Sequence, residues 1–166
     1  MSSSSSESSI SLRPPSPADR ERVHALLAAT EVFRAEELDV ALEVFDGALA
    51  GEGYFGALAC QGDDVVGLAF WGEAPMTEGT YDLYWLASDP AAHGSGAAKV
   101  LLHHVVSDVR ARGGRLLLVE TESTPGYARA RRFYEREGLA EIARVRDYYR
   151  AGADKIIGAM RLNPQD

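Results

Sequence analysis

The sequence of 166 residues has little cysteine, few basic residues and no long apolar run. The single cysteine, Cys60, excludes an intramolecular disulfide, and no cluster of Cys and His has the spacing of a zinc site. We therefore expect no metal, and we expect a reducing, cytoplasmic environment. No stretch approaches the ~20 apolar residues of a membrane helix, and the first residues lack the basic and apolar segments of a signal peptide.

The charge balance is acidic, with 17 Lys and Arg against 25 Asp and Glu and a net charge of -8. Such a surface repels the phosphates of nucleic acids and of anionic membranes, so neither is expected as a partner. A cationic small molecule, such as an amine, is not repelled. The length and the 46% hydrophobic content predict one domain over residues 10–166, after a disordered serine-rich tail over residues 1–9.

Hydrophobic periodicity predicts secondary structure in the order βααβββαβαββ. Helices are expected to begin near residues 18, 35, 97 and 127. The expected strands cover residues 10–13, 55–60, 65–71, 81–88, 115–121, 140–149 and 155–162. This order predicts an α/β (α+β) fold with a mixed, mainly antiparallel sheet flanked by helices and one βαβ crossover.

A glycine-rich turn follows the expected strand 81–88 and opens the next helix. A helix start presents unpaired N–H groups and a positive dipole end, which attract anions. Gly94 and Gly96 would let a phosphate approach the backbone closely. Lys99 does not follow a glycine as in a P-loop, and the early βαβ unit of a dinucleotide-binding fold is missing. The alternative is a tight strand-to-helix turn that binds nothing.

Two segments resemble motifs of the GNAT superfamily of acyl-CoA-dependent N-acetyltransferases. The stretch His93-Gly94-Ser95-Gly96-Ala97-Ala98 is similar to its acyl-CoA loop, Gln/Arg-x-x-Gly-x-Gly/Ala, with His93 at the Gln/Arg position. The stretch from Ala130 to Leu139 is similar to the family's helix ending in Tyr-Glu-x-x-Gly-Phe, with Tyr127 where the family usually has asparagine. The resemblance covers roughly residues 10–162.

The resemblance implies a GNAT-like fold, acetyl-CoA as cosubstrate, and direct acetyl transfer to a primary amine of a small molecule or peptide. It implies that strand 81–88 separates from its neighbour and binds the pantetheine arm, and that Tyr134 is the general acid for the leaving thiolate. The alternative for Tyr134 is a packing role. The residues implied to bind the cosubstrate are Leu86, Ala87, Ser88, His93, Gly94, Ser95, Gly96, Ala97, Ala98 and Lys99.

Asp82 and Glu120 are equal candidates for the general base. Asp82 lies among aromatic residues on the strand before the loop, and Glu120 ends an otherwise apolar run. A carboxylate in an apolar strand is usually paired, perturbed or functional. The alternatives are a solvated strand residue for Asp82 and a structural ion pair for Glu120.

Four residues are expected to contact the acceptor: Glu31, Phe33, Tyr84 and Tyr148. Glu31 and Phe33 lie between the first two helices, a region that the family uses for the acceptor, and a plain helix connection is the alternative. Tyr148 lies between the last two strands, where an aromatic pair at a hairpin edge explains it almost as well. A homodimer is compatible with the sequence. The alternative function is a non-catalytic acyl-CoA sensor or interaction module on the same fold.

Overall fold

The computed structural model describes residues 9–162. The predicted tail over residues 1–9 lies outside this part of the chain except for Ser9, as do residues 163–166 of the predicted domain.

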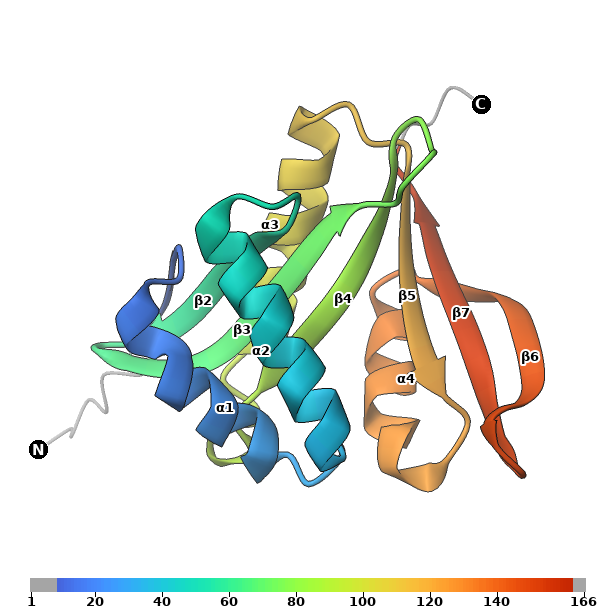
Figure 1. Ribbon diagram of the computed structural model, residues 1–166, viewed down its shortest axis with the longest axis horizontal. Coiled ribbons are helices and arrows are strands. Elements are labelled where there is room, and N and C mark those ends of the chain that lie inside the picture. Colours follow the sequence, from blue (N-terminus) through green and yellow to red (C-terminus); the bar gives the residue numbers. More distant parts are fainter. Residues whose placement is uncertain (1–8, 163–166) are drawn as a thin grey trace, which may run out of the picture.

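The described residues form strands and helices in the predicted order (Figure 1). The strands are β1 (Ile10–Arg13), β2 (Phe55–Gln61), β3 (Asp64–Glu73), β4 (Thr80–Ser88), β5 (Leu116–Glu122), β6 (Ala140–Arg150) and β7 (Ala153–Arg161). The α-helices are α1 (Arg20–Ala29), α2 (Ala35–Ala50), α3 (Ala97–Ala111) and α4 (Ala128–Arg136), with short 3-10 turns η1 (Pro17–Asp19), η2 (Pro90–Ala92) and η3 (Pro125–Tyr127). The predicted fold class is confirmed.

The sheet has the strand order β1-β2-β3-β4-β5-β7-β6 and is antiparallel at each junction except the one between β4 and β5. Those two strands are parallel because α3 crosses over between them. Only Thr80–Leu83 of β4 pair with β5, through Leu116–Val119. Strand β4 nevertheless continues to Ser88, and β5 continues to Glu122. Their second halves therefore diverge, as Figure 1 shows and as the resemblance implied.

A bulge marks the point at which β4 leaves β5. On the neighbouring strand β3, Phe70 pairs with Trp85 and Trp71 pairs with Leu83, so Tyr84 is the extra residue of β4. An extra residue bends a strand and shifts the alternation of its side chains. Leu83 accordingly packs on the α3 side of the sheet, whereas Trp85 packs on the α1 and α2 side.

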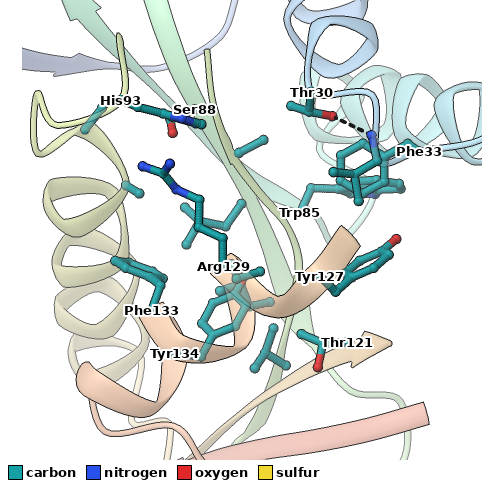
Figure 2. Close-up of a pocket in the computed structure, with 18 of the residues that line it drawn as sticks. Thr30, Phe33, Trp85, Ser88, His93, Thr121, Tyr127, Arg129, Phe133 and Tyr134 are labelled. Carbon is teal, nitrogen blue, oxygen red and sulfur yellow. Dashed lines mark hydrogen bonds between the residues drawn. The ribbon is translucent and has the colours of Figure 1, made fainter. Parts of the chain in front are cut away.

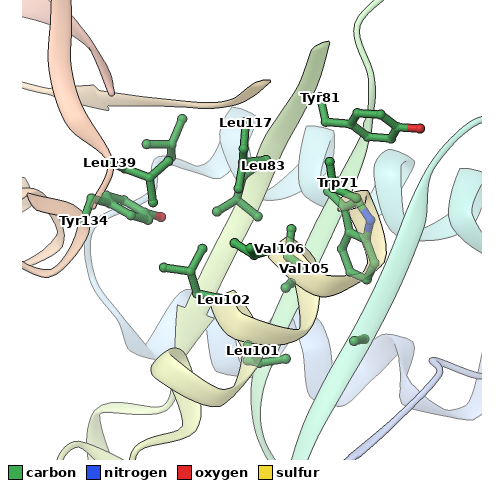
Figure 3. Packing of buried hydrophobic residues seen from close by; sticks show 14 of the residues in the cluster. Trp71, Tyr81, Leu83, Leu101, Leu102, Val105, Val106, Leu117, Tyr134 and Leu139 are labelled. Atoms are coloured by element: carbon green, nitrogen blue, oxygen red, sulfur yellow. The ribbon is translucent and has the colours of Figure 1, made fainter. Parts of the chain in front are cut away.

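Two apolar clusters hold the helices on opposite faces of the sheet. In the α1 and α2 cluster, Val23, Leu26 and Phe45 are fully buried. The cluster under α3 is shown in Figure 3, where Tyr134 of α4 lies at its edge near Leu139. Burying large side chains of this kind supplies ~1.5–3 kcal/mol each, so both helix layers are well anchored.

A buried carboxylate ties β1 to the start of α1. Both guanidinium nitrogens of Arg13 donate to the Asp19 carboxylate, at 2.8 and 2.7 Å. The Ser16 backbone N–H and hydroxyl also donate to it, at 2.8 and 3.0 Å. These hydrogen bonds, Arg13 first, outweigh burial and hold the pKa of Asp19 well below its usual range. The network fixes where α1 starts relative to the edge of the sheet.

We expect Asp19→Asn to lower the free energy of unfolding at pH 7 by about 1–3 kcal/mol, because buried donors lose a charged acceptor. The folded pKa lies below the unfolded value of ~3.9, so this stabilisation is present above that pH and fades as the pH falls below it. Denaturant unfolding at pH 7 and at lower pH checks both points. Asp46→Asn, which breaks an exposed pair with Arg20, should change little. Equal losses in both variants would contradict the argument.

Candidate active site

A cavity of about 1040 Å³ lies where β4 and β5 diverge. Its walls come from β4, the start of α3, β5, α4 and the connection between α1 and α2, together with Tyr149 of β6. Figure 2 shows side chains from these segments facing one another. The divergence of the two strands thus brings the predicted loop and the predicted general acid to one space.

The glycine-rich loop forms the end of the cavity at which the cosubstrate is expected, which we call the cofactor end. Gly94 and Gly96 have φ angles of +87° and +84°, which favour glycine, and a Cβ at either position would meet no atom within 4 Å. Ser95 Oγ accepts from the Ala97 N–H at 3.3 Å. The N–H groups of Ala98 and Lys99 have no acceptor among the described residues. Their donors point outward from a helix start, so this loop fits the anionic phosphates of a CoA molecule.

Two hydrogen bonds hold the turn that precedes this loop. Asp89 accepts from the Ala91 N–H at 3.0 Å and from the Arg22 guanidinium at 2.6 Å. Arg22 also donates to the Val65 carbonyl at 3.0 Å. Helix α1 is therefore joined directly to the start of β3 and to the turn that follows β4.

Basic side chains line the cofactor end. Burial and the nearby Arg129 lower the pKa of His93, so its ring is neutral at pH 7. The positive charge comes instead from Lys99, Arg129 and Arg136, which all line the cavity. Arg129 extends from α4 toward Ser88 and His93 (Figure 2). The sequence analysis did not single out Arg129, although its spacing from Phe133 and Arg136 places all three on one helix face.

Tyr134 belongs both to the core and to the cavity wall. It is buried, packs in the α3 cluster, and has its ring centre 5.5 Å from that of Phe133. Burial raises the pKa of its hydroxyl, which therefore stays protonated near neutral pH. Among the described residues this hydroxyl has no hydrogen-bond partner. The side chain can therefore offer its proton to a ligand in the cavity.

The two candidate bases lie on the same face of the sheet but differ in access. Glu120 lines the cavity and forms an ion pair with Lys155, whose Nζ lies 3.0 Å from Oε1. Asp82 is half-buried and is not among the lining residues. Burial, and then the charge of Glu120, raise the pKa of Asp82, while Lys155 opposes this shift. The charge of Glu120 therefore acts on Asp82, and of the two carboxylates only Glu120 lines the cavity.

The opposite end of the cavity, which we call the acceptor end because the acceptor is expected there, contains two of the four residues predicted to contact the acceptor. Phe33 and Tyr84 line the cavity, whereas Glu31 and Tyr148 do not. Tyr149 lines it in place of Tyr148, which is exposed and has Lys155 Nζ 4.5 Å from its ring centre. Asp147, with a φ of +54°, interrupts the regular alternation just before these tyrosines.

An aromatic wall that the sequence analysis did not predict completes the acceptor end. The Phe33 ring meets Trp85 edge to face at 4.9 Å and Tyr127 at 6.4 Å between centres. The bulge at Tyr84 turns Trp85 toward this side of the sheet, and a bulge leaves little sequence signal. Three carboxylates also line this end: Glu37, Glu120 and Glu122.

Within residues 9–162, no three His, Cys, Asp or Glu side chains group as metal ligands would. None of the described helices is long and apolar enough to cross a membrane.

Comparison with known proteins identifies the family. The model of the acetyltransferase (GNAT) family matches residues 20–139. A solved structure from Desulfovibrio desulfuricans, assigned to the GNAT family as an acetyltransferase, is 43% identical, with a TM-score of 0.89 over 93% of this chain and 100% of its own. No curated protein matches the sequence.

Two more distant structures share the fold alone. The ribosomal-protein-S18-alanine N-acetyltransferase of Escherichia coli is 21% identical, with a TM-score of 0.76 over 95% of this chain and 96% of its own. A Salmonella typhimurium protein, solved with its cofactor acetyl-CoA, is 17% identical, with a TM-score of 0.75 and the same coverage. Together with the family model and the 43% identical relative, they lead to one conclusion: this chain belongs to the GNAT family of acetyltransferases.

Proposed function

We propose that this chain transfers an acetyl group from acetyl-CoA to a primary amine by direct attack, without a covalent enzyme intermediate. The observation that carries the proposal is the single cavity that joins the anion-binding loop, the unpaired edge of β4 and Tyr134. The Salmonella relative solved with acetyl-CoA supports the choice of cosubstrate. Cys60, the one cysteine, is buried beside α1 and α2 and does not line the cavity, which argues against a thioester intermediate on the protein.

The cosubstrate would be held by backbone groups more than by side chains. The N–H groups at the start of α3 would bind the pyrophosphate, with Lys99 and Arg129 adding charge. Leu86, Ala87 and Ser88 lie beyond the last β4–β5 pair, so their edge toward β5 is free to pair with the pantetheine arm. When bound, acetyl-CoA supplies the activated acyl group. An N–H of Ala87 or Ser88 would polarise its carbonyl.

The amine must lose a proton and the leaving sulfur must gain stabilisation. Glu120 lines the cavity and would accept the amine proton, directly or through one water. Asp82 does not line the cavity and would act only through its charge. On the α3 side, the Tyr134 hydroxyl would donate to the departing thiolate. Because burial raises its pKa, the hydroxyl is fully protonated before the reaction and returns readily to that state.

Release of CoA against a panel of primary amines tests the proposal as a whole. Amine-dependent release is expected, with the acetylated amine as the second product. Tight acetyl-CoA binding with no release above the hydrolytic background for any amine would favour the non-catalytic acyl-CoA sensor instead.

Ala98→Glu should weaken CoA binding by roughly ten-fold or more, because the new carboxylate lies where the pyrophosphate meets the helix start. The same charge favours the helix dipole, so the fold should not suffer. Val100→Glu adds the same charge on the same helix but outside the cavity, and it serves as the matched control. Titration calorimetry measures both affinities. Equal affinities for the two folded variants would place the CoA site elsewhere.

Glu120→Gln should lower kcat/KM by ~100-fold near neutral pH, and the loss should shrink at high pH, where the amine is already neutral. We expect a smaller loss for Asp82→Asn, which removes a carboxylate that does not face the cavity. The pH–rate profiles of both variants measure this. If both profiles match that of the wild type on a confirmed acceptor, solvent deprotonates the amine and neither residue is the base.

Tyr134→Phe keeps the ring and its packing and removes only the hydroxyl. Turnover should fall by at least ~100-fold once chemistry is rate-limiting, while thermal stability and acetyl-CoA affinity change little. Single-turnover kinetics and calorimetry separate these effects. Normal turnover by Tyr134→Phe, together with unfolding of Tyr134→Ala, would show that Tyr134 is a packing residue.

A further inference from the structure

The charged side chains that line the cavity are separated by sign. At the cofactor end, the basic residues Lys99, Arg129 and Arg136 face one carboxylate, Glu137. At the acceptor end, the charged residues that the structure describes in the wall are Glu37, Glu120 and Glu122, without a lysine or arginine. A negative field in a partly enclosed space concentrates cations, so the acceptor end favours a positively charged ligand.

Glu122 is the most informative of these carboxylates. Its side chain is 6% exposed and lines the cavity. Both of its hydrogen bonds engage Oε1, which accepts from Arg150 at 2.8 Å and from the Thr124 hydroxyl at 3.2 Å. Oε2 has no donor within the described part of the chain. No buried side-chain oxygen of the described residues lacks a hydrogen-bond partner, so Oε2 is accessible from the cavity, where an ammonium group would supply a charge-assisted donor.

The position of Glu122 is fixed by its neighbours. Arg131 of α4 donates to the backbone carbonyls of Glu122 and Thr124, which locks the end of β5 against the helix. Arg150 and Thr124 hold the carboxylate itself, so it does not have to be ordered when a ligand binds. Prior ordering of this kind lowers the entropic cost of binding.

The cations that pair with these carboxylates do not line the cavity. Arg34 and Arg150 are 63% and 52% exposed, so solvent screens their charges. Lys155 is 15% exposed and contacts Glu120 from β7, so it offsets the charge of Glu120 and leaves Glu37 and Glu122 as the main source of negative charge at this end. Asp82, which shares a face with Glu120, has no ion-pair partner among the described residues. The raised pKa values of Tyr84, Tyr127 and Tyr149, due first to burial and then to surrounding carboxylates, agree with a negative field at this end.

Aromatic faces stand beside the carboxylates. Phe33, Trp85 and Tyr127 line the cavity, and Phe33 meets each of the other two rings edge to face. A cation against such a face gains ~0.5–2 kcal/mol, more when it is desolvated. A ring wall with a buried carboxylate suits an alkylammonium better than it suits a neutral or anionic group.

We propose that the acceptor is a dicationic amine, of which one amino group is acetylated and a second ammonium is held by Glu122 against the aromatic wall. This inference rests on the proposed function. An acceptor that carries a carboxylate in place of the second ammonium would face three carboxylates and should be rejected.

Three matched amines test this inference: 1,4-diaminobutane, pentylamine and 5-aminopentanoate. They share a primary amine on a short chain and differ in the charge at the far end. We expect kcat/KM for the diamine to exceed that for pentylamine by about ten-fold or more, since one charge-assisted hydrogen bond distinguishes them. The aminopentanoate should be the poorest acceptor. Calorimetry with the CoA-bound protein gives the same ranking as affinities, independent of turnover.

Variants connect the ranking to Glu122. Glu122→Gln should raise KM for the diamine by about ten-fold and affect kcat/KM for pentylamine much less, whereas Glu122→Asp should restore part of the preference. Glu37→Gln removes a second carboxylate of the acceptor end and leaves β5 unchanged. The Gln side chain can still accept from the Arg34 N–H and so keep the helix cap that Glu37 forms. Glu36→Gln, an exposed change on the same helix, is the matched control.

The outcomes separate the two proposals. If wild-type protein uses the diamine and pentylamine equally well, or if Glu122→Gln impairs both equally, the dicationic acceptor is wrong and acetyl transfer stands. If none of the three amines binds to the CoA-loaded protein, the dicationic acceptor is wrong whatever the activity toward other amines. Binding of the diamine without any acetylated product would support the site and overturn the proposed reaction.

Discussion

The early end of pairing between β4 and β5 is the constraint on which the rest of the site depends. Four residue pairs hold the two strands together, and beyond Leu83 and Val119 each strand has an edge with no partner. An unpaired edge in a protein interior would be costly, so it must face either solvent or a ligand. The divergence creates this edge, opens the cavity between the strands, and lets α4 approach from one side and the α1–α2 connection from the other.

The fold was largely predictable because its signals are local. The amphipathic period of α2, with glycines after it, predicted the bounds that the structure has, Ala35–Ala50, and the glycine-rich turn predicted the start of α3. Side-chain direction was less predictable, because it depends on backbone irregularities. The bulge at Tyr84 sends Trp85 to the acceptor end, and the left-handed Asp147 precedes the exchange of Tyr148 for Tyr149 in the wall.

The charged residues of the cavity also divide into one that the sequence could predict and others that it could not. Lys99 follows the loop motif in sequence and was predictable, whereas Arg129 and Glu122 come from separate elements that meet only in the folded chain. From the sequence alone, Glu122 is only a polar residue at the end of a strand. Its significance lies in its burial and in the one oxygen without a donor, and both are properties of the packing of α4 against β5.

Helix α1 links the two ends of the cavity. In its first turn, Arg22 is bonded to Asp89 in the turn before the glycine-rich loop, and its last residue leads directly into the segment that carries Phe33. A helix of ten residues is about 15 Å long. Helix α1 is therefore a spacer, which sets how far the turn before the glycine-rich loop lies from the segment that carries Phe33.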